Sequence, residues 1–154
     1  MSTRSGGTWT PMPRPRSSPG WNAPSPTPRC PRACACSRGA GAHDALGRPD
    51  LAVAGYRAAL EAGLDEHRAR QATIQLASSL RNLGAPDEGL RLLAALDTGS
   101  GDGLDDAVVV FRALMLADLG REREALASTM HALADHLPRY RISARRYAAA
   151  LIEG

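Results

Sequence analysis

From about residue 43 onward, apolar side chains recur every three or four positions with polar ones between them, which is the spacing of one face of an α-helix. The pattern is clearest from Asp65 to Leu83, where Asp65 also suits the cap of a helix N-terminus. A shorter leucine stripe follows over 86–96, and the same plan returns in 104–137. The pattern therefore predicts a series of amphipathic helices.

A short block, Leu-Gly-x-Pro-Asp, interrupts this pattern at 46–50 and at 83–87, and a shortened copy, Leu-Gly-Arg, stands at 119–121. The three glycines are 37 and 36 residues apart. Glycine just beyond a helix adopts the left-handed backbone conformation at little cost and ends that helix, whereas proline suits the first turn of the next one. Each block therefore predicts a tight turn between two antiparallel helices.

A recurrence of this length between helical segments is typical of stacked helix-turn-helix repeats. We expect an all-α fold in which antiparallel helix-turn-helix repeats stack as a short right-handed solenoid. The expected units are a remnant repeat at 43–63, repeats at 65–97 and 104–137, and a capping helix at 140–153, with a glycine-rich loop over 97–103. The capping helix carries one narrow apolar stripe, made of Tyr140, Ala144, Tyr147, Ala148 and Leu151.

Residues 1–42 have a different composition from the rest of the chain. They hold eight of the eleven prolines, all three cysteines, both tryptophans and six arginines, but no acidic residue. Such a segment has few aliphatic side chains to offset the entropy of ordering its backbone. We therefore expect a disordered leader over 1–42, and a folded part that carries a net charge of the opposite sign.

The leader stands where the first repeat needs its first helix, because only the last turn of such a helix is recognisable before Gly47. This mismatch suggests a hypothesis that residues 1–42 come from a wrong start or a shifted reading frame. The second helix of the remnant repeat would then lack its cover, and we expect self-association through the uncovered strip, which consists of Ala52, Tyr56, Ala59 and Leu60.

Two kinds of chemistry are conceivable in the leader. Cys30, Cys34, Cys36 and His43 are four possible metal ligands, but their spacing is not that of a usual zinc site, and unpaired thiols are the favoured interpretation. Six arginines interleaved with tryptophans are compatible with nucleic-acid binding, which stays open as a less favoured alternative.

The residues after each turn carry a resemblance to a known family. Small, large and small side chains follow the turn glycine by five, nine and twelve positions, as in Ala52, Tyr56 and Ala59, and more loosely in Gly89, Leu93, Leu96, Ala125, Thr129 and Ala132. Together with the Leu76-Ala77 pair upstream, this arrangement resembles tetratricopeptide repeats, most closely the bacterial group-five family, over about residues 43–154. The resemblance implies a protein or peptide partner bound in the groove that the first helices form.

By this resemblance, the groove is lined by the exposed side of the first helix of each repeat. In the second repeat the implied partner-binding residues are Gln71, Ile74, Gln75, Ser78, Arg81 and Asn82, and in the third they are Val110, Phe111, Leu114 and Asp118. For Phe111, core or inter-repeat packing is favoured over ligand contact. The clamp that some repeats of this family use for a terminal carboxylate needs several basic and amide side chains, of which only Arg81 and Asn82 are present.

The sequence contains no recognisable catalytic arrangement. His131 and His136 are five residues apart, which is a poor helical spacing for a shared metal, and no serine has a nucleophile-elbow context. We expect no catalytic residue, cofactor or metal, and a non-enzymatic interaction or scaffold module, with a purely structural self-associating module as an alternative. Residues 1–42 also lack the apolar stretch of a secretory signal, and no stretch of the chain is long and apolar enough to span a membrane, so we expect a cytoplasmic protein that does not bind membranes.

Overall fold

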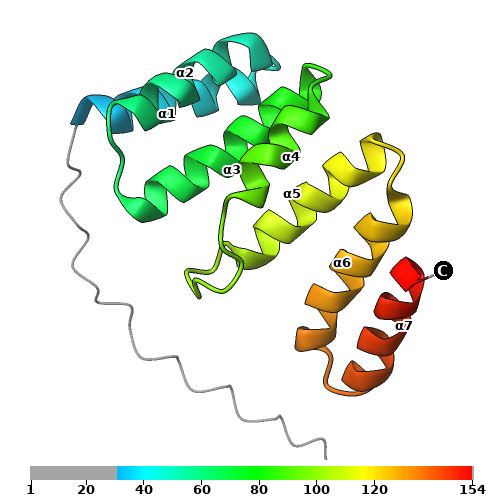
Figure 1. Cartoon of the computed structure of the whole chain (residues 1–154). Helices are drawn as coiled ribbons and strands as arrows, with labels where there is room; N and C mark the ends of the chain where they lie inside the picture. The colour runs from blue at the N-terminus through cyan, green and yellow to red at the C-terminus, as the bar shows by residue number, and fades with distance from the viewer. Residues whose placement is uncertain (1–30, 154) are drawn as a thin grey trace, which may run out of the picture.

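The computed structural model describes residues 31–153, and these residues form α-helices joined by short connections. The helices pack in chain order as consecutive antiparallel pairs, as Figure 1 shows. The expected all-α helical-repeat architecture is confirmed. In order, the elements are α1 (Pro31–Ala45), α2 (Pro49–Glu61), α3 (Glu66–Asn82), α4 (Pro86–Ala94), α5 (Asp105–Asp118), α6 (Glu122–His136) and α7 (Arg141–Glu153).

The three glycine turns have the conformation that the sequence predicts. The backbone φ angles of Gly47, Gly84 and Gly120 are +70°, +80° and +73°, all in the left-handed region. In each turn the amide of the residue after the glycine donates to a carbonyl five residues earlier, at 2.8 to 3.0 Å, which satisfies an acceptor at the helix end. Pro49 and Pro86 then begin α2 and α4. Local chemistry alone therefore fixes how each pair folds back.

Helix α3 begins at the expected cap. The Asp65 side chain accepts a hydrogen bond from the Arg68 amide at 3.1 Å, which satisfies one of the free donors of the first turn. Desolvation raises the pKa of Asp65, but the hydrogen bonds and the positive charge of Arg68 outweigh it, so that the pKa of Asp65 is lowered. The cap fixes where the central helix of the stack starts.

Two buried clusters hold the first five helices together. One joins α1, α2 and α3 around the fully buried Tyr56, and the other joins α3, α4 and α5 around the fully buried Leu93 and Met115. Gly89 lets α4 approach closely, because a Cβ atom there would lie 2.9 Å from the backbone oxygen of Ala77. Helix α3 is thus covered on two sides, by the preceding and by the following pair.

The prediction that residues 31–42 are disordered is wrong, because they form most of α1. The eight leader prolines all lie at or before Pro31, and the segment that follows is rich in alanine and free of proline up to Pro49. Proline at the first helical position is compatible with a helix. Composition averaged over 1–42 hid this boundary. The hypothesis of a wrong start or a shifted reading frame was based on a missing first helix, and α1 provides that helix from residue 31 onward. The expectations for residues 1–30 lie outside the described residues.

Helix α1 packs on α2 through small side chains and covers the strip that the sequence left open. A Cβ atom at Gly55 would lie only 2.9 Å from the Ala40 Cβ atom, so the two helices approach closely. Ala52, Tyr56 and Ala59 are 0% exposed, and Leu60 is partly buried. The predicted uncovered strip is therefore wrong: the first unit is a complete helix pair rather than a remnant, and self-association through this strip has no support.

The third pair has a smaller core than the first two. Its buried cluster contains only Ala113, Leu116 and Ala125, with Leu90 against it. Helix α7 packs on α6, and no Cα atom of α7 lies within 8 Å of a Cα atom of α5. Ala148 in the expected stripe of α7 is buried and Ala144 and Leu151 are partly so, but Tyr140 and Tyr147 are 77% and 69% exposed, which corrects the prediction for the two tyrosines. The capping helix thus contacts the stack through small residues.

Candidate functional site

The predicted partner-binding residues lie on α3, and the neighbouring helices α2, α4 and α5 already cover much of the surface of this helix. Gln71 and Asn82 are exposed, and Gln75, Ser78 and Arg81 are partly exposed. Ile74 is only 5% exposed and packs in the cluster with Val108 and Met115, so its assignment to the exposed face is wrong. The physical reason is that α5 covers the flank of α3 on which Ile74 lies. A helical pattern shows which stripe of a helix is buried, but it does not show how much of the helix surface the neighbouring helices bury.

Arg81 is engaged within the protein rather than free for a ligand. Its Nη2 atom donates to Oδ1 of Asp118 at 3.0 Å, and its Nε atom donates to Oδ2 of the same carboxylate. The hydrogen bond to Asp118 raises the pKa of the Arg81 guanidinium. Two residues that the sequence analysis placed separately on the groove therefore form one bidentate ion pair that joins the ends of α3 and α5.

Helix α5 carries two exposed apolar side chains at positions equivalent to residues of α3. Val110 and Leu114 are 46% and 40% exposed, and the repeat spacing of 36 residues places them at the positions of Ile74 and Ser78. Phe111 is half-buried and packs against the cluster between α3, α4 and α5, as its interpretation as a core residue predicts. We call the surface formed by Gln71, Gln75, Ser78, Asn82, Val110 and Leu114 the α3–α5 face.

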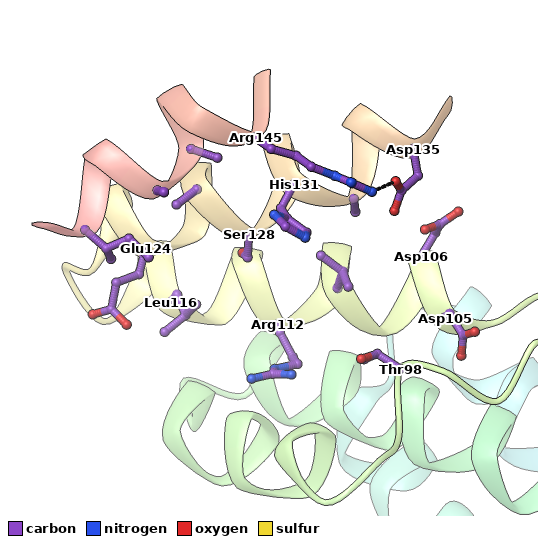
Figure 2. Close-up of a pocket in the computed structure, with 16 residues that line it drawn as sticks. Thr98, Asp105, Asp106, Arg112, Leu116, Glu124, Ser128, His131, Asp135 and Arg145 are labelled. Atoms are coloured by element: carbon purple, nitrogen blue, oxygen red, sulfur yellow. Dashed lines mark hydrogen bonds and ion pairs between the residues drawn. The ribbon is translucent and has the colours of Figure 1, made fainter. Parts of the chain in front are cut away.

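A cleft of about 720 Å³ opens between α5, α6 and α7, and Figure 2 shows its lining. The helical pattern of the sequence did not predict this cleft. Arg112 lies at one side and Arg145 at the other, with Ser128 and His131 between them. The apolar part of the lining comes from all three helices and consists of Val109, Leu116, Ala127, Ala132, Ala148, Ala149 and Ile152. None of the six predicted partner-binding residues of α3 contributes to this cleft.

Most charges around the cleft are compensated by neighbours. Asp135 pairs with Arg145, which together with Arg141 lowers the pKa of Asp135 despite desolvation. Glu124 pairs with Arg121 at 2.7 Å, and a hydrogen bond from Arg121 lowers its pKa. Arg112 has no acidic side chain within ion-pair distance among residues 31–153.

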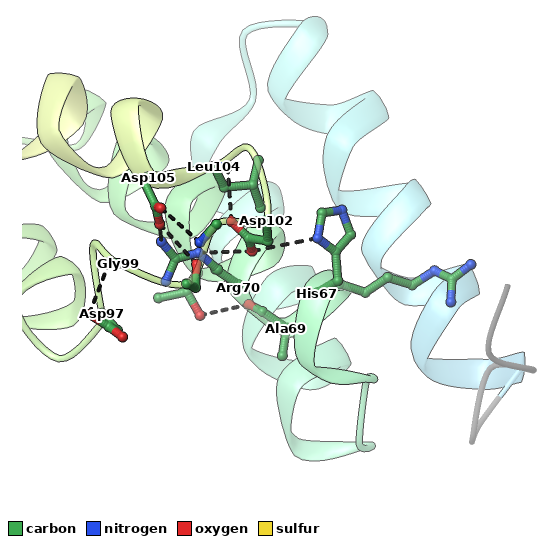
Figure 3. A network of polar contacts seen from close by, with 12 residues as sticks. His67, Ala69, Arg70, Asp97, Gly99, Asp102, Leu104 and Asp105 are labelled. Carbon is green, nitrogen blue, oxygen red and sulfur yellow. Dashed lines mark hydrogen bonds and ion pairs between the residues drawn. The ribbon is translucent and has the colours of Figure 1, made fainter. Parts of the chain in front are cut away.

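A buried arginine anchors the loop that precedes α5, as seen in Figure 3. The Arg70 side chain is 8% exposed, and its Nη2 atom donates to Oδ1 of Asp105 at 2.6 Å while Nε lies 3.1 Å from Oδ2 of Asp102. Backbone and hydroxyl donors at Gly101 and Ser100 lower the pKa of Asp105. The cluster orders the glycine-rich loop and fixes the start of α5, which the sequence did not reveal because the partners are more than 30 residues apart.

The cysteines that the sequence offered as possible metal ligands differ in their exposure. Cys34 is buried on α1 and Cys36 is partly exposed, both with free thiols, and Cys30 lies outside the described residues. Within 31–153, no three side chains of metal-ligating type gather closely enough to hold an ion. The arginines and tryptophans behind the nucleic-acid alternative lie mainly before residue 31, so that alternative stays a prediction.

None of the helices described here has the length and apolar character that crossing a membrane requires. His131 lines the cleft, whereas Nε2 of His136 lies 2.9 Å from Oδ2 of Asp106, which is also part of the lining. The polar side chains along α5 and α6 are therefore arranged around a surface cleft.

Comparison with known proteins agrees with this architecture. A family model described as Tetratrico peptide repeat, of group five, matches residues 33–151. The match begins within α1 and ends within α7, so it spans every helix described above. No curated protein and no solved structure shows significant similarity to the chain.

Proposed function

This chain belongs to the tetratricopeptide repeat family, and we propose that it is a non-enzymatic module that binds a segment of a partner protein on the α3–α5 face. Domains of this family generally serve protein–protein interaction, and the match is to a repeat family rather than to a family of enzymes. The partner segment lies across two neighbouring first helices, as the resemblance implied.

The observation that carries this proposal is the pairing of exposed apolar and amide side chains on adjacent helices. Val110 and Leu114 remain 46% and 40% exposed on α5, whereas Val108 and Met115 of the same helix are buried. On α3, Gln71 is exposed and Gln75 is partly exposed, and an amide side chain both donates and accepts hydrogen bonds. An extended peptide presents unpaired backbone donors and acceptors together with apolar side chains, so this surface offers partners for both.

Arg81 and Asp118 have a structural role in this proposal. Their bidentate pair links the C-terminal ends of α3 and α5, and both side chains are only about one-third exposed. The pair fixes the spacing of the two helices and leaves the binding itself to neutral side chains. This arrangement differs from a clamp that holds a terminal carboxylate, because Arg81 is neutralised by Asp118.

The proposal is tested by a pulldown with the full-length chain as bait. Leu114→Asp places a charge on the α3–α5 face, while the matched control Leu126→Asp places the same charge on α6, where Leu126 is 51% exposed. We expect capture of a specific partner to be lost with Leu114→Asp, reduced with Gln75→Ala, and retained with Leu126→Asp, all variants keeping the wild-type circular dichroism spectrum. Equal capture by the two leucine variants, or no specific capture by the wild-type chain, would contradict the proposal.

The cytoplasm is the compartment that fits this function best. Cys34 and Cys36 carry free thiols, and such thiols persist in a reducing compartment. Labelling of the native cell fractions with an antibody against the chain tests this assignment, and recovery from a secreted fraction would contradict it.

A further inference from the structure

The helices α6 and α7 form the last antiparallel pair of the stack, and one side of this pair is open. Helix α7 packs on α6 and, among the described residues, on no other helix, as its place at the end of the stack in Figure 1 shows. The cleft lined by α5, α6 and α7 marks the inner side of the pair. The outer side faces away from the rest of the stack.

Helix periodicity identifies the residues of the outer side. Leu126 and Leu133 of α6 and Tyr147 of α7 each stand two positions from residues that line the cleft, namely Ser128, His131, Arg145 and Ala149. An offset of two residues corresponds to about 200° around a helix, so these three side chains point away from the cleft. They therefore lie on the same, outer side of the two packed helices.

The outer side exposes large apolar side chains. Leu126, Leu133 and Tyr147 are 51%, 55% and 69% exposed, and the partly exposed Met130 lies between the two leucines along α6. Tyr140 is 77% exposed and stands one residue before α7, about two helical turns from Tyr147. We call the surface formed by Leu126, Met130, Leu133, Tyr140 and Tyr147 the α6–α7 outer face.

The charges around this face differ between its two ends, while the face itself contains no charged residue. Because α6 and α7 are antiparallel, the start of α6 and the end of α7 share one end, which is net negative and holds Arg121, Glu122, Arg123, Glu124 and Glu153. The other end, around the α6–α7 connection, is net positive and holds Asp135, Arg139, Arg141 and Arg145. Neither Glu122 nor Arg139 has an ion-pair partner among residues 31–153.

We infer that the α6–α7 outer face is an interface through which two copies of this chain form a two-fold symmetric dimer. In such a dimer both copies use the same face. When the two helix pairs lie antiparallel to each other, the negative end of one copy meets the positive end of the other, and the neutral apolar centre brings no like charges together. The face shares no residue with the α3–α5 face, so the dimer and the proposed function are independent.

The area of the face is sufficient for a weak dimer. A fully exposed tyrosine side chain offers on the order of 200 Å², so Tyr140 and Tyr147 together contribute on the order of 300 Å² per chain. With the two leucines and Met130, two copies bury on the order of 1,000 Å² in total, which is at the lower limit for a specific interface. Such an area predicts a dissociation constant of roughly tens of micromolar.

The oligomeric state of the full-length chain tests this inference. Sedimentation velocity is measured with a reducing agent present, at concentrations from about 1 to 200 μM, a range that brackets the expected affinity. We expect the monomer at the lowest concentrations and the dimer at the highest. A chain that stays monomeric throughout, or that forms larger species without a dimer plateau, overturns the inference.

Matched variants locate the interface. Tyr147→Asp places a charge at the centre of the outer face, whereas Ile142→Asp places the same charge elsewhere on α7, where Ile142 is 78% exposed and lies about 140° around the helix from Tyr147. With circular dichroism spectra unchanged, we expect Tyr147→Asp to remain monomeric and Ile142→Asp to dimerise like wild type. Equal behaviour of the two variants would place the interface elsewhere and overturn the inference.

Two leucine variants separate the dimer from the proposed function. Leu126→Asp should lose the dimer and retain capture of a partner through the α3–α5 face, whereas Leu114→Asp should do the reverse. Loss of the dimer with Leu114→Asp but not with Leu126→Asp would contradict the inference and leave the proposed function untouched.

A charge exchange tests the antiparallel orientation. Glu122→Arg and Arg139→Glu each bring like charges together in a dimer with itself, so each variant should dimerise about tenfold more weakly than wild type. A mixture of the two variants restores opposite charges at both ends. With one variant labelled by a fluorophore at its N-terminal amine, fluorescence-detected sedimentation should show near wild-type dimerisation in the mixture, which a folding defect cannot produce. Equally weak association of the mixture and of the separate variants would refute this orientation.

Discussion

Replacing Gly55 by alanine tests whether α1 is docked on α2. A Cβ atom at residue 55 would lie 2.9 Å from the Ala40 Cβ atom and 3.3 Å from its Cα atom. Neither atom belongs to a flexible side chain, so the conflict can be relieved only by moving the two helices apart. That movement would loosen the cover over Val53 and Tyr56, which are 7% and 0% exposed.

The size of the effect follows from two opposing contributions. Alanine in place of glycine within a helix stabilises by up to about 1 kcal/mol, whereas overpacking a close interface costs about 1–3 kcal/mol. We expect Gly55→Ala to lower the free energy of unfolding by about 1–2 kcal/mol, which corresponds to a fall of roughly 3–10 °C in the melting temperature.

Gly39 provides the matched control for this substitution. It also lies within a helix, α1, but no atom lies within 4 Å of the position that its Cβ would take. Gly39→Ala should therefore show only the gain in helix propensity and raise stability by up to about 1 kcal/mol. Thermal and urea unfolding followed by circular dichroism measure both variants. If Gly55→Ala stabilises the protein as much as Gly39→Ala does, α1 is not packed on α2 as described.

Three further predictions concern stability and titration. Leu93→Ala removes a fully buried side chain that joins α3, α4 and α5, and it should cost about 2–5 kcal/mol in urea unfolding, whereas the exposed Leu133→Ala should stay within about 0.5 kcal/mol of wild type. Burial, reinforced by the charge of Asp44, raises the pKa of Tyr56 to about 12, so ultraviolet titration should show one phenol that ionises late and that is absent in Tyr56→Phe. The free energy of unfolding should fall as the pH rises from about 10 towards 12, because only the unfolded state ionises easily in that range. Titration of every tyrosine at its ordinary pKa would refute this prediction. The pKa of Asp105 is lowered in the folded state, so its ionised carboxylate stabilises the fold at pH values above the unfolded-state pKa of about 4, and this contribution is lost as the pH falls further. Acid should therefore destabilise the wild-type protein more than Asp105→Asn. Identical acid unfolding profiles would disprove the role of this carboxylate.

The features that the sequence predicted correctly are those set by local chemistry. The three turns follow from glycine and proline within a few residues, and the Asp65 cap needs only the amide of Arg68. The helix pattern over 65–96 depends on apolar spacing that no distant residue alters, although α4 ends at Ala94, slightly earlier than the pattern suggested. These elements were sufficient to identify the repeat architecture.

The incorrect and missing features depend on contacts between distant segments. Helix α1 was missed because alanine, glycine and cysteine bury little area alone, and their contribution appears only when α2 brings the large side chains of Val53 and Tyr56. Ile74 was misplaced because α5 covers its flank of α3. The pair Arg81–Asp118 and the cleft beside α7 both depend on how separate repeats sit together, which one helical pattern cannot encode.

Amide hydrogen exchange of the full-length chain, alone and with the partner captured through the α3–α5 face, tests the central claim most directly. We predict that the partner slows exchange in α3 and α5, over Glu66–Asn82 and Asp105–Asp118, and leaves the rates in α2 unchanged. Slowing confined to α2 and α6, or no change in α3 and α5, would contradict the account.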